Sequence, residues 1–291
     1  MNHSSQSSTT AAARGFTLAR PWLVADIGGT NARFGWLADG ADEVAHVATL
    51  AGSDFSGPVA AARAYLAELS ASLGGHFQAP RAGAFAVATA VGSDWVALTN
   101  SGWSFSRQAT QQDLGLAELI LLNDFEALAL ALPRLRPGQV RPIGLRMAAA
   151  AGALAVIGPG TGLGVAGLVP TPQGWVPVAG EGGHASLSAT DAFESALLAV
   201  VWQHHAHVSA ERLLSGIGLP VLQQAVAAVL GQPTPLLLSA EDIVERGLAR
   251  QDAVCDQTID TFCALALLGS FAGNVALVLG ARGGVYISGG A

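Results

Sequence analysis

A pair of glycine-rich turns of matching form constrains this chain more than any other feature of its sequence. The first half carries DIGGT at 26–30 and the second half carries GPGTG at 158–162, each between two apolar segments. Each turn contains a Gly-Thr step, where backbone N–H groups lack side-chain cover and can face an anion. The repeat suggests two hairpins that together bind a polyphosphate, although ordinary β-turns explain the same pattern about equally well.

Strands and helices are expected to alternate along the chain, which favours the α/β class. The segment 134–146 contains prolines and arginines and is the expected linker. The predicted organisation is a disordered polar tail over 1–20, a small α/β domain over 21–133 and a large α/β domain over 134–291. Strands are expected at 23–26, 32–37, 82–89, 95–99, 119–122, 153–157, 164–169 and 285–288, and helices at 58–73, 125–131, 191–204, 219–230, 240–250 and 255–279.

Lysine is absent from the chain, since all 14 of its basic residues are arginine. A Walker A loop, a Schiff-base lysine and the strand lysine of protein kinases are therefore excluded. The formal charge of −7 argues against nucleic acid as the main partner, because phosphate backbones require a basic face. Cys255 and Cys263 form no CxxC pair, which indicates neither a zinc knuckle nor a redox pair, and reduced thiols suit a cytosolic protein.

One uncharged segment, 261–281, is long enough to cross a bilayer. It spaces Gly269 and Gly273 as membrane-helix dimers often do. Asn274 and several glycines lower its hydrophobicity, so a buried helix in a large soluble core is the preferred interpretation. Residues 1–20 lack the apolar core of a signal peptide.

A GxGxxG match at Gly162, Gly164 and Gly167 is followed by Glu181 at a plausible distance for a ribose-binding acid. A dinucleotide-binding motif must open a helix, whereas here the glycines lie in an expected strand and Pro170 follows directly. A dehydrogenase is therefore excluded.

Several motifs occur in a specific order between residues 23 and 290, and with them the chain resembles bacterial glucokinases of the non-zinc, enterobacterial type. The motifs are DIGGTNARF (26–34), DWVALTNSGWSFS (94–106), LLNDFEALA (121–129), GPGTGLGVA (158–166), GEGGH (180–184), SAERLLSGIGL (209–219) and GGVYISGG (283–290). The resemblance implies the two-domain actin-like ATPase (ribonuclease H-like) fold, with a cleft between the domains. It also implies a cytoplasmic homodimer that uses ATP and Mg²⁺ to phosphorylate D-glucose at the 6-hydroxyl, the first step of glycolysis, giving glucose 6-phosphate and ADP.

The resemblance gives Asp124 the role of general base toward the sugar 6-hydroxyl, a role typically worth about 10²–10⁴ in rate. Considered alone, an Asn-Asp pair before an expected helix would be interpreted as a helix N-cap. Glu211 could likewise form an ordinary helix ion pair with Arg212, and the GEGGH segment could be a surface loop. The substrate-binding residues that the resemblance implies are Asn100, Asn123, Asp124, Glu181, His184 and Glu211.

The resemblance also implies a nucleotide site without lysine. Asp26 is expected to hold Mg²⁺ through water, because Mg²⁺ keeps part of its hydration shell. Arg33 either adds charge near the phosphates or forms a structural ion pair with Asp26. The histidines at 204, 205 and 207 are expected to be solvent-exposed at a helix end, since no acidic or sulfur ligand accompanies them. The ATP-binding residues implied are Asp26, Gly28, Gly29, Thr30, Asn31, Gly160, Thr161, Gly162, Gly283, Gly284, Gly289 and Gly290.

Some departures from the family pattern leave a second function open. The family commonly has a proline where Ala90 stands, and the sequence after His184 reads ASLSA in place of a more acidic stretch. The chain stops at Ala291, where the family normally continues with a further segment and a final helix. The alternative is a catalytically weak or inactive sugar-binding or regulatory relative.

Overall fold

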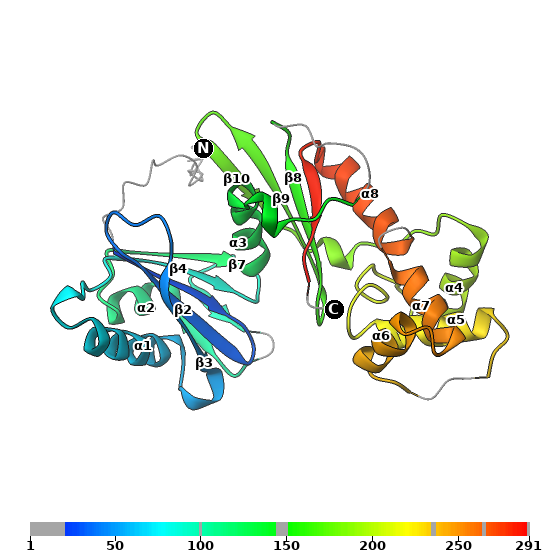
Figure 1. The fold of residues 1–291 in the computed structure, drawn as a ribbon, viewed down its shortest axis with the longest axis horizontal. Coiled ribbons are helices and arrows are strands. Elements are labelled where there is room, and N and C mark those ends of the chain that lie inside the picture. Colours follow the sequence, from blue (N-terminus) through cyan, green and yellow to red (C-terminus); the bar gives the residue numbers. More distant parts are fainter. Residues whose placement is uncertain (1–20, 99–100, 144–150, 234–236, 264–265, 290–291) are drawn as a thin grey trace, which may run out of the picture. The chain divides into compact units, whose positions relative to one another are not determined.

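The computed structural model describes residues 21–98, 101–143, 151–233, 237–263 and 266–289. Contacts divide the chain into two compact units, both of mixed α/β composition (Figure 1). The first unit runs to Asp124 and includes Pro172–Gly174, and the second consists of Phe125–Thr171 and Trp175–Ala291. The division thus falls directly after Asp124, whereas the sequence pattern predicts a boundary between 133 and 134.

The first unit is built on a five-stranded sheet with the strand order β3-β2-β1-β4-β7. The two strands β1 and β2 form an antiparallel hairpin, whereas β1, β4 and β7 run parallel. Residues of β1 alternate in burial, with Leu23 and Ile27 fully buried, because successive side chains of a strand point to opposite faces. The strands are β1 (Trp22–Ile27), β2 (Asn31–Leu37), β3 (Ala45–Ala51), β4 (Ala82–Val87) and β7 (Glu118–Asn123).

Two helices complete the first unit. The helix α1 (Pro58–Leu73) has the predicted bounds, with proline at its first position and Gly74 after its end at a φ of 53°, which favours glycine. Its Tyr65 stacks on Phe34 with the ring centroids 5.6 Å apart. The short helix α2 (Arg107–Asp113) follows a small hairpin of β5 (Trp95–Ala97) and β6 (Ser104–Ser106).

The second unit contains a four-stranded sheet in the order β10-β9-β8-β11. The central strand β8 (Leu154–Pro159) is buried along its whole length. Its neighbours are the antiparallel β9 (Leu163–Thr171) and the parallel β11 (Gly284–Ile287), and β10 (Gly174–Val178) forms the edge. Burial of a strand on both faces requires cover on both sides of the sheet.

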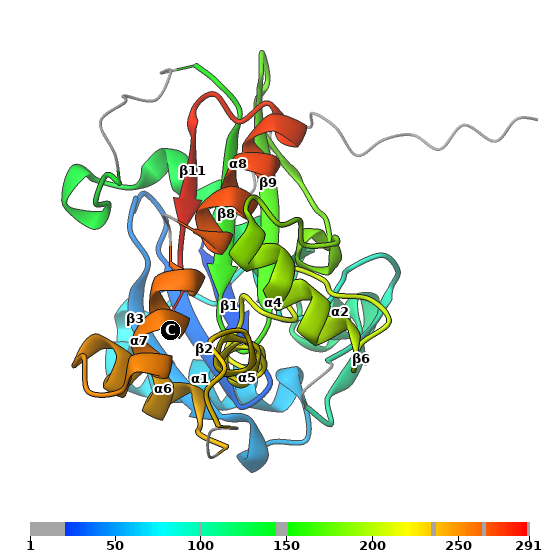
Figure 2. The same cartoon turned by 90° about the vertical axis from the view of Figure 1, so that its right-hand side faces the viewer.

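That cover comes from helices on opposite faces (Figure 1). Val156 packs in a cluster with Ala129 of α3 (Asp124–Ala131). Ile157, the next residue, belongs to a different cluster that includes Phe271 of α8 (Leu267–Leu279). Four further helices contribute buried residues to the same cluster as Ile157 (Figure 2). They are α4 (Ala192–Trp202), α5 (Leu219–Val229), α6 (Ala240–Leu248) and α7 (Ala253–Phe262).

The sequence pattern is wrong about a single helix over 255–279. The helix α7 ends at Phe262, and Cys263 has an extended backbone with a ψ of 174°. The helix α8 begins at Leu267, so α7 packs with α5 and α6 while α8 lies on the sheet. Tertiary packing thus overrides the helical propensity of a continuous apolar segment.

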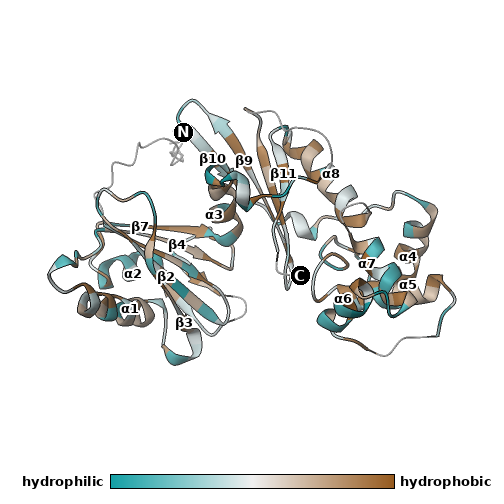
Figure 3. Cartoon of the chain, in the orientation of Figure 1, coloured by the Kyte–Doolittle hydropathy of each residue, from teal (hydrophilic) through white to brown (hydrophobic). Residues whose placement is uncertain are grey.

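The same region contains the one stretch of the described residues, Ala253–Leu279, that is apolar and long enough for a membrane span. Only 25% of its most apolar window is buried. The expectation of a buried core helix therefore holds for one face of α8 only, since Leu277 and Val278 are 83% and 84% exposed. Figure 3 shows hydrophobic colouring along much of this helix.

Candidate active site

The first glycine turn joins β1 to β2 in the first unit, as predicted. The Gly28 N–H donates to the Asn31 carbonyl at 2.9 Å, and the Thr30 carbonyl accepts from Gly52 at 2.8 Å. These bonds fix the turn while leaving Thr30 and Asn31 exposed. A hollow of about 280 Å³ adjoins it, lined by Asp26, Gly28, Gly29, Thr30, Asn31, Arg33 and Thr49.

Asp26 and Arg33 face each other across the hairpin that this turn closes. They are register partners, and Arg33 Nη1 lies 3.9 Å from Asp26 Oδ2. Both side chains are about 60% exposed, at 60% for Arg33 and 62% for Asp26, so the pair contributes little to stability. The ion pair that the sequence allowed is therefore present, and both side chains also line the hollow.

Asn123 and Asp124 lie at the edge of the sheet where this turn begins. Ile27, Val87 and Asn123 are aligned across the parallel strands β1, β4 and β7, which therefore end side by side. The Asn123 amide donates through Nδ2 to the Thr89 carbonyl at 3.1 Å. Asp124 is half-buried at the first residue of α3, where a carboxylate is also favoured by the helix dipole. The carboxyl edge of parallel strands is where α/β folds bind ligands.

The second glycine turn joins β8 to β9 in the second unit. Gly158 pairs with Gly164 and Pro159 with Leu163, and the Gly160 N–H donates to the Gly162 carbonyl at 2.9 Å. A Cβ on Gly160 would meet no atom within 4 Å, so this part of the turn is open. The GxGxxG match continues into the strand β9, which confirms that it is no dinucleotide-binding motif.

The GEGGH segment forms a turn, η5 (Gly182–His184), that packs on β9. A Cβ on Gly183 would overlap the Leu163 carbonyl, so only glycine allows this approach. The Gly183 carbonyl accepts from the Glu211 N–H at 2.9 Å, which anchors the 209–218 loop to the turn.

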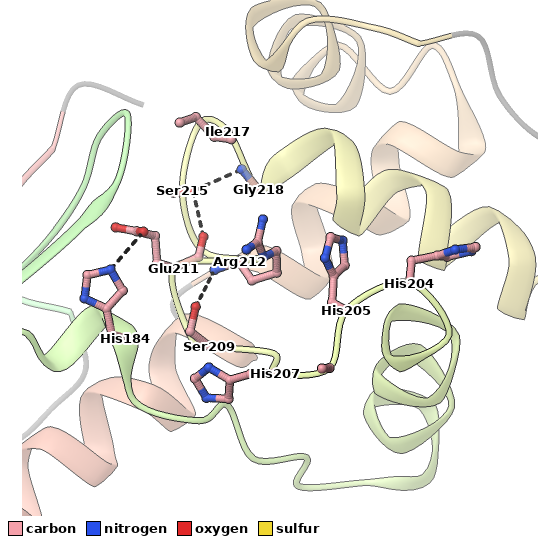
Figure 4. A pocket seen from close by; sticks show the side chains of 11 residues that line it. His184, His204, His205, His207, Ser209, Glu211, Arg212, Ser215, Ile217 and Gly218 are labelled. Atoms are coloured by element: carbon pink, nitrogen blue, oxygen red, sulfur yellow. Dashed lines mark hydrogen bonds and ion pairs between the residues drawn. The ribbon is translucent and has the colours of Figure 1, made fainter. Parts of the chain in front are cut away.

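These contacts bring the predicted sugar residues of the second unit together, and Figure 4 shows two of them, His184 and Glu211. His184 Nδ1 lies 3.5 Å from Glu181 Oε2, and His184 Nε2 lies 3.5 Å from Glu211 Oε1. The other oxygen of Glu211, Oε2, accepts from the Leu163 N–H at 2.8 Å. The result is a pair of carboxylates flanking an imidazole, a set that can accept and donate hydrogen bonds to hydroxyl groups.

A cavity of about 560 Å³ adjoins this cluster and is lined by His184 and by His204, His205 and His207. His204 and His205 follow the end of α4, as expected, and His207 Nε2 lies 3.0 Å from the Ser186 hydroxyl. Among the described residues no group of three or more His, Cys, Asp and Glu side chains is arranged to hold a metal ion. Figure 4 shows the histidine side chains separated from one another.

The structure brings some of the predicted nucleotide residues together and not others. Gly289 lies against the Pro159 carbonyl, beside the second turn. Gly283 and Gly284 lie at the opposite end of β11, aligned with Leu154, where a Cβ on Gly283 would collide with Leu154 and Gly152. Packing therefore accounts for glycine at 283. Asn100 and Gly290 lie outside the described residues.

The sequence analysis includes the motif at 209–219 but predicts no role for the residues that follow Glu211. Gly216 and Ile217 contact the second turn directly, through hydrogen bonds from their backbone N–H groups to the carbonyls of Gly160 and Thr161. The signal was present in the Ser-Gly-Ile-Gly sequence, whose glycines again permit a close backbone approach.

The fold is the two-domain actin-like ATPase fold. The crystal structure of a ROK family glucokinase from Streptomyces griseus, in complex with glucose and AMPPNP, superposes with a TM-score of 0.55 and 19% identity. The match covers 93% of this chain and 83% of that one. At this identity the likeness shows the fold alone.

Closer relatives identify the family. A glucokinase from an Antarctic psychrotroph matches with a TM-score of 0.83 and 39% identity over 93% of this chain and 83% of that chain. The glucokinase of Aromatoleum aromaticum is 46% identical over 270 residues, which are 93% of this chain and 79% of the relative. The family model for glucokinase matches residues 23–291. The chain belongs to the glucokinase family and is a kinase that phosphorylates glucose with ATP. None of these relatives supports the alternative of a sugar-binding protein without turnover.

Proposed function

We propose that Asp124 is the general base of this kinase and accepts the proton of the glucose 6-hydroxyl. The observation that carries the proposal is the position of Asp124 at the end of β7, on the same sheet edge as the first glycine turn. The 6-oxygen forms a bond to the γ-phosphorus while the bond from that phosphorus to the bridging oxygen breaks. The proton of the hydroxyl passes to Asp124, and ADP leaves with the electron pair of the broken bond. Phosphoryl transfer needs little more from a protein than such positioning and charge stabilisation.

Glucose is recognised by Glu181, His184 and Glu211, together with Asn123 and Asp124. The support is the spacing of 3.5 Å from each carboxylate to the imidazole, which sets donors and acceptors at fixed positions. A hydroxyl group is identified by geometry, so fixed partners reject analogues that lack one. Asn100 is a further contact proposed on the family resemblance.

The phosphates of ATP are held by backbone N–H groups of the two glycine turns, 28–31 and 160–162. The support is the open space at Gly160 and the exposure of Thr30 and Asn31. Gly289 lies beside the second turn and is proposed for the adenosine side. The same role for Gly283 and Gly284 rests on the resemblance, and so does that of Gly290.

Asp26 fits a magnesium ion that arrives with ATP. It is the single carboxylate among the residues lining the hollow, and it is 62% exposed. Mg²⁺ is commonly bound through one or two carboxylates, substrate phosphates and its own waters. When bound, the ion supplies neutralisation of the charge that develops on the phosphoryl oxygens. Asp26 holds and orients its waters.

The central test is product identification with matched variants. The purified chain with glucose, ATP and Mg²⁺ should give a product that phosphorus and carbon NMR identify as phosphorylated at C6, with no product when Mg²⁺ is chelated.

Glu181→Gln should raise the KM for glucose roughly 10- to 100-fold, the worth of a hydrogen bond to a charged group. Glu245→Gln, at an exposed position of α6, is the control. A Glu181→Gln variant with the KM of the parent would remove Glu181 from the sugar site.

We also place the enzyme in the cytoplasm as a homodimer. The free thiols of Cys255 and Cys263 support a reducing compartment, and the dimer rests on the family resemblance. Light scattering should give twice the chain mass of 29.4 kDa. A single-chain mass at micromolar concentration would contradict the dimer.

A further inference from the structure

The loop from Glu211 to Gly218 is bonded to the second glycine turn at several points. The Gly216 N–H donates to the Gly160 carbonyl at 2.7 Å, and the Ile217 N–H donates to the Thr161 carbonyl at 3.4 Å. At the other end of the loop, the Leu163 N–H donates to Glu211 Oε2 at 2.8 Å. Loop and turn therefore form one hydrogen-bonded unit.

Steric contacts make this attachment tight. A Cβ on Gly162 would lie 2.5 Å from Glu211 Oε2, and a Cβ on Gly216 would lie 3.2 Å from the Gly160 carbonyl oxygen. A side chain at Gly162 would therefore displace the Glu211 carboxylate, and one at Gly216 would press on the backbone of the turn.

Ser215 holds the loop in the conformation that makes these contacts. Its side chain is almost fully buried, with 1% of the residue exposed. The hydroxyl donates to the Glu211 carbonyl at 2.7 Å and accepts from the Gly218 N–H at 3.0 Å (Figure 4). Ser215 thus joins both ends of the loop, directly beside Gly216.

We propose that Ser215 is a positioning residue through which the 211–218 loop couples glucose binding at Glu211 to phosphate binding at Gly160–Gly162. The coupling rests on the proposed function of these two groups. A ligand that fixes the turn fixes the Glu211 carboxylate through Leu163 and the loop, and glucose on Glu211 fixes the turn in return. Such a coupling is reciprocal by thermodynamic necessity.

The coupling is measured as the ratio of two dissociation constants for glucose, one without nucleotide and one with a saturating non-hydrolysable ATP analogue. In the parent enzyme the analogue should tighten glucose binding at least threefold. In Ser215→Ala the ratio should fall toward 1, and the KM for ATP should rise while glucose binding without nucleotide changes less than threefold. A purely structural role of Ser215 would lower the melting temperature without this selective effect.

Ser195→Ala is a matched control. The Ser195 hydroxyl donates to the carbonyl four residues earlier, Asp191, at 2.8 Å, the same pattern as Ser215 to Glu211. Ser195 lies on α4, and its hydrogen bonds go to Asp191 rather than to the turn. Because Ser195 is exposed, Ser195→Ala should lose less stability than Ser215→Ala, and it should keep the parent's coupling ratio.

Gly162→Ala tests the same connection from the side of the turn. The added methyl group should displace Glu211 Oε2 from Leu163, so glucose should bind at least fivefold more weakly even without nucleotide. The Glu211 carboxylate lies at the end of a flexible side chain and can move away from the added methyl group, so the variant should fold.

Four results separate failure of this inference from failure of the proposed function. Full coupling in Ser215→Ala, or unchanged glucose affinity in Gly162→Ala, would overturn the inference while leaving the proposed function intact. Absence of coupling in the parent enzyme would overturn it in the same way. An unchanged glucose affinity in Glu211→Gln would instead contradict the proposed sugar site itself.

Discussion

Gly183 shows at the scale of one residue how the candidate sugar site depends on missing side chains. The turn that carries His184 approaches β9 so closely at Gly183 that a Cβ would overlap the Leu163 carbonyl. The same glycine accepts the N–H of Glu211 through its carbonyl. A displacement of Gly183 therefore moves two residues predicted to bind glucose, His184 and Glu211, together.

Gly183→Ala should lower the free energy of unfolding by about 1–3 kcal/mol, the usual cost of overpacking. It should also raise the KM for glucose. Gly180→Ala is the control, since a Cβ on Gly180 would meet no atom within 4 Å. Urea denaturation and a coupled assay measure the two effects, and equal behaviour of both variants would contradict the packing argument.

Sequence reasoning predicts individual site residues where they belong to a motif with a chemical role. Asn123 and Asp124 were predicted at a strand end, and the structure confirms that position. Sequence reasoning cannot predict contacts that depend on tertiary packing. Nothing local in the sequence places Ser215 between Glu211 and Gly218, or sets Gly283 at the end of β11 away from the turn.

At the scale of elements, the helix α7 depends on a single cap. Asp252 Oδ1 accepts from the N–H groups of Val254 at 2.9 Å and Cys255 at 3.0 Å. The hydrogen bond from the Cys255 N–H is the main cause that holds the pKa of Asp252 below its ordinary value, and the bond from the Val254 N–H adds to it. Partial desolvation of the carboxylate opposes this lowering.

Asp252→Ala should therefore cost about 1 kcal/mol at neutral pH, the typical value for an N-cap. A lowered folded-state pKa contributes stability above the unfolded value of 3.8, and the contribution is lost as pH falls through the lower folded value. The difference between parent and variant should be constant above about pH 5 and shrink below it. Urea denaturation across this range, with Glu245→Ala as control, measures it; a difference that grows in acid would contradict the cap.

The two faces of α8 should respond differently to truncation. Phe271 is 5% exposed in the core, whereas Leu277 is 83% exposed. Phe271→Ala should cost about 3–5 kcal/mol, and Leu277→Ala should change stability by less than about 0.5 kcal/mol. Comparable losses in thermal unfolding would mean that the exposed face is covered in solution.

The elements that sequence reasoning found are those with strong local signals. The helix α1 has proline at its start and glycine after its end, and its bounds were predicted. The strand β3 and the helix α2 were missed because β3 is a mostly exposed edge strand and α2 has a single buried residue, Thr110. Neither has the apolar periodicity on which such predictions depend.

For the whole molecule, the sequence predicted the fold class and the family, and both are confirmed. The order of the motifs carried that prediction, because each motif lies at a strand end or a turn that the fold needs. The chain contains no lysine, and backbone N–H groups of glycine turns can take the place of a cationic side chain at phosphates.

Asp124 is proposed to take the proton of the glucose 6-hydroxyl as well as to contact the sugar, and not merely to stabilise the start of the helix α3. The direct test compares the equilibrium dissociation constant for glucose with kcat in Asp124→Asn, a variant that keeps the size of the side chain and removes its basicity. The dissociation constant should stay within about fivefold of the parent's, while kcat should fall by roughly 10²–10⁴. A kcat within tenfold of the parent's, or a loss that lies wholly in glucose binding, would contradict the role of Asp124 as the base.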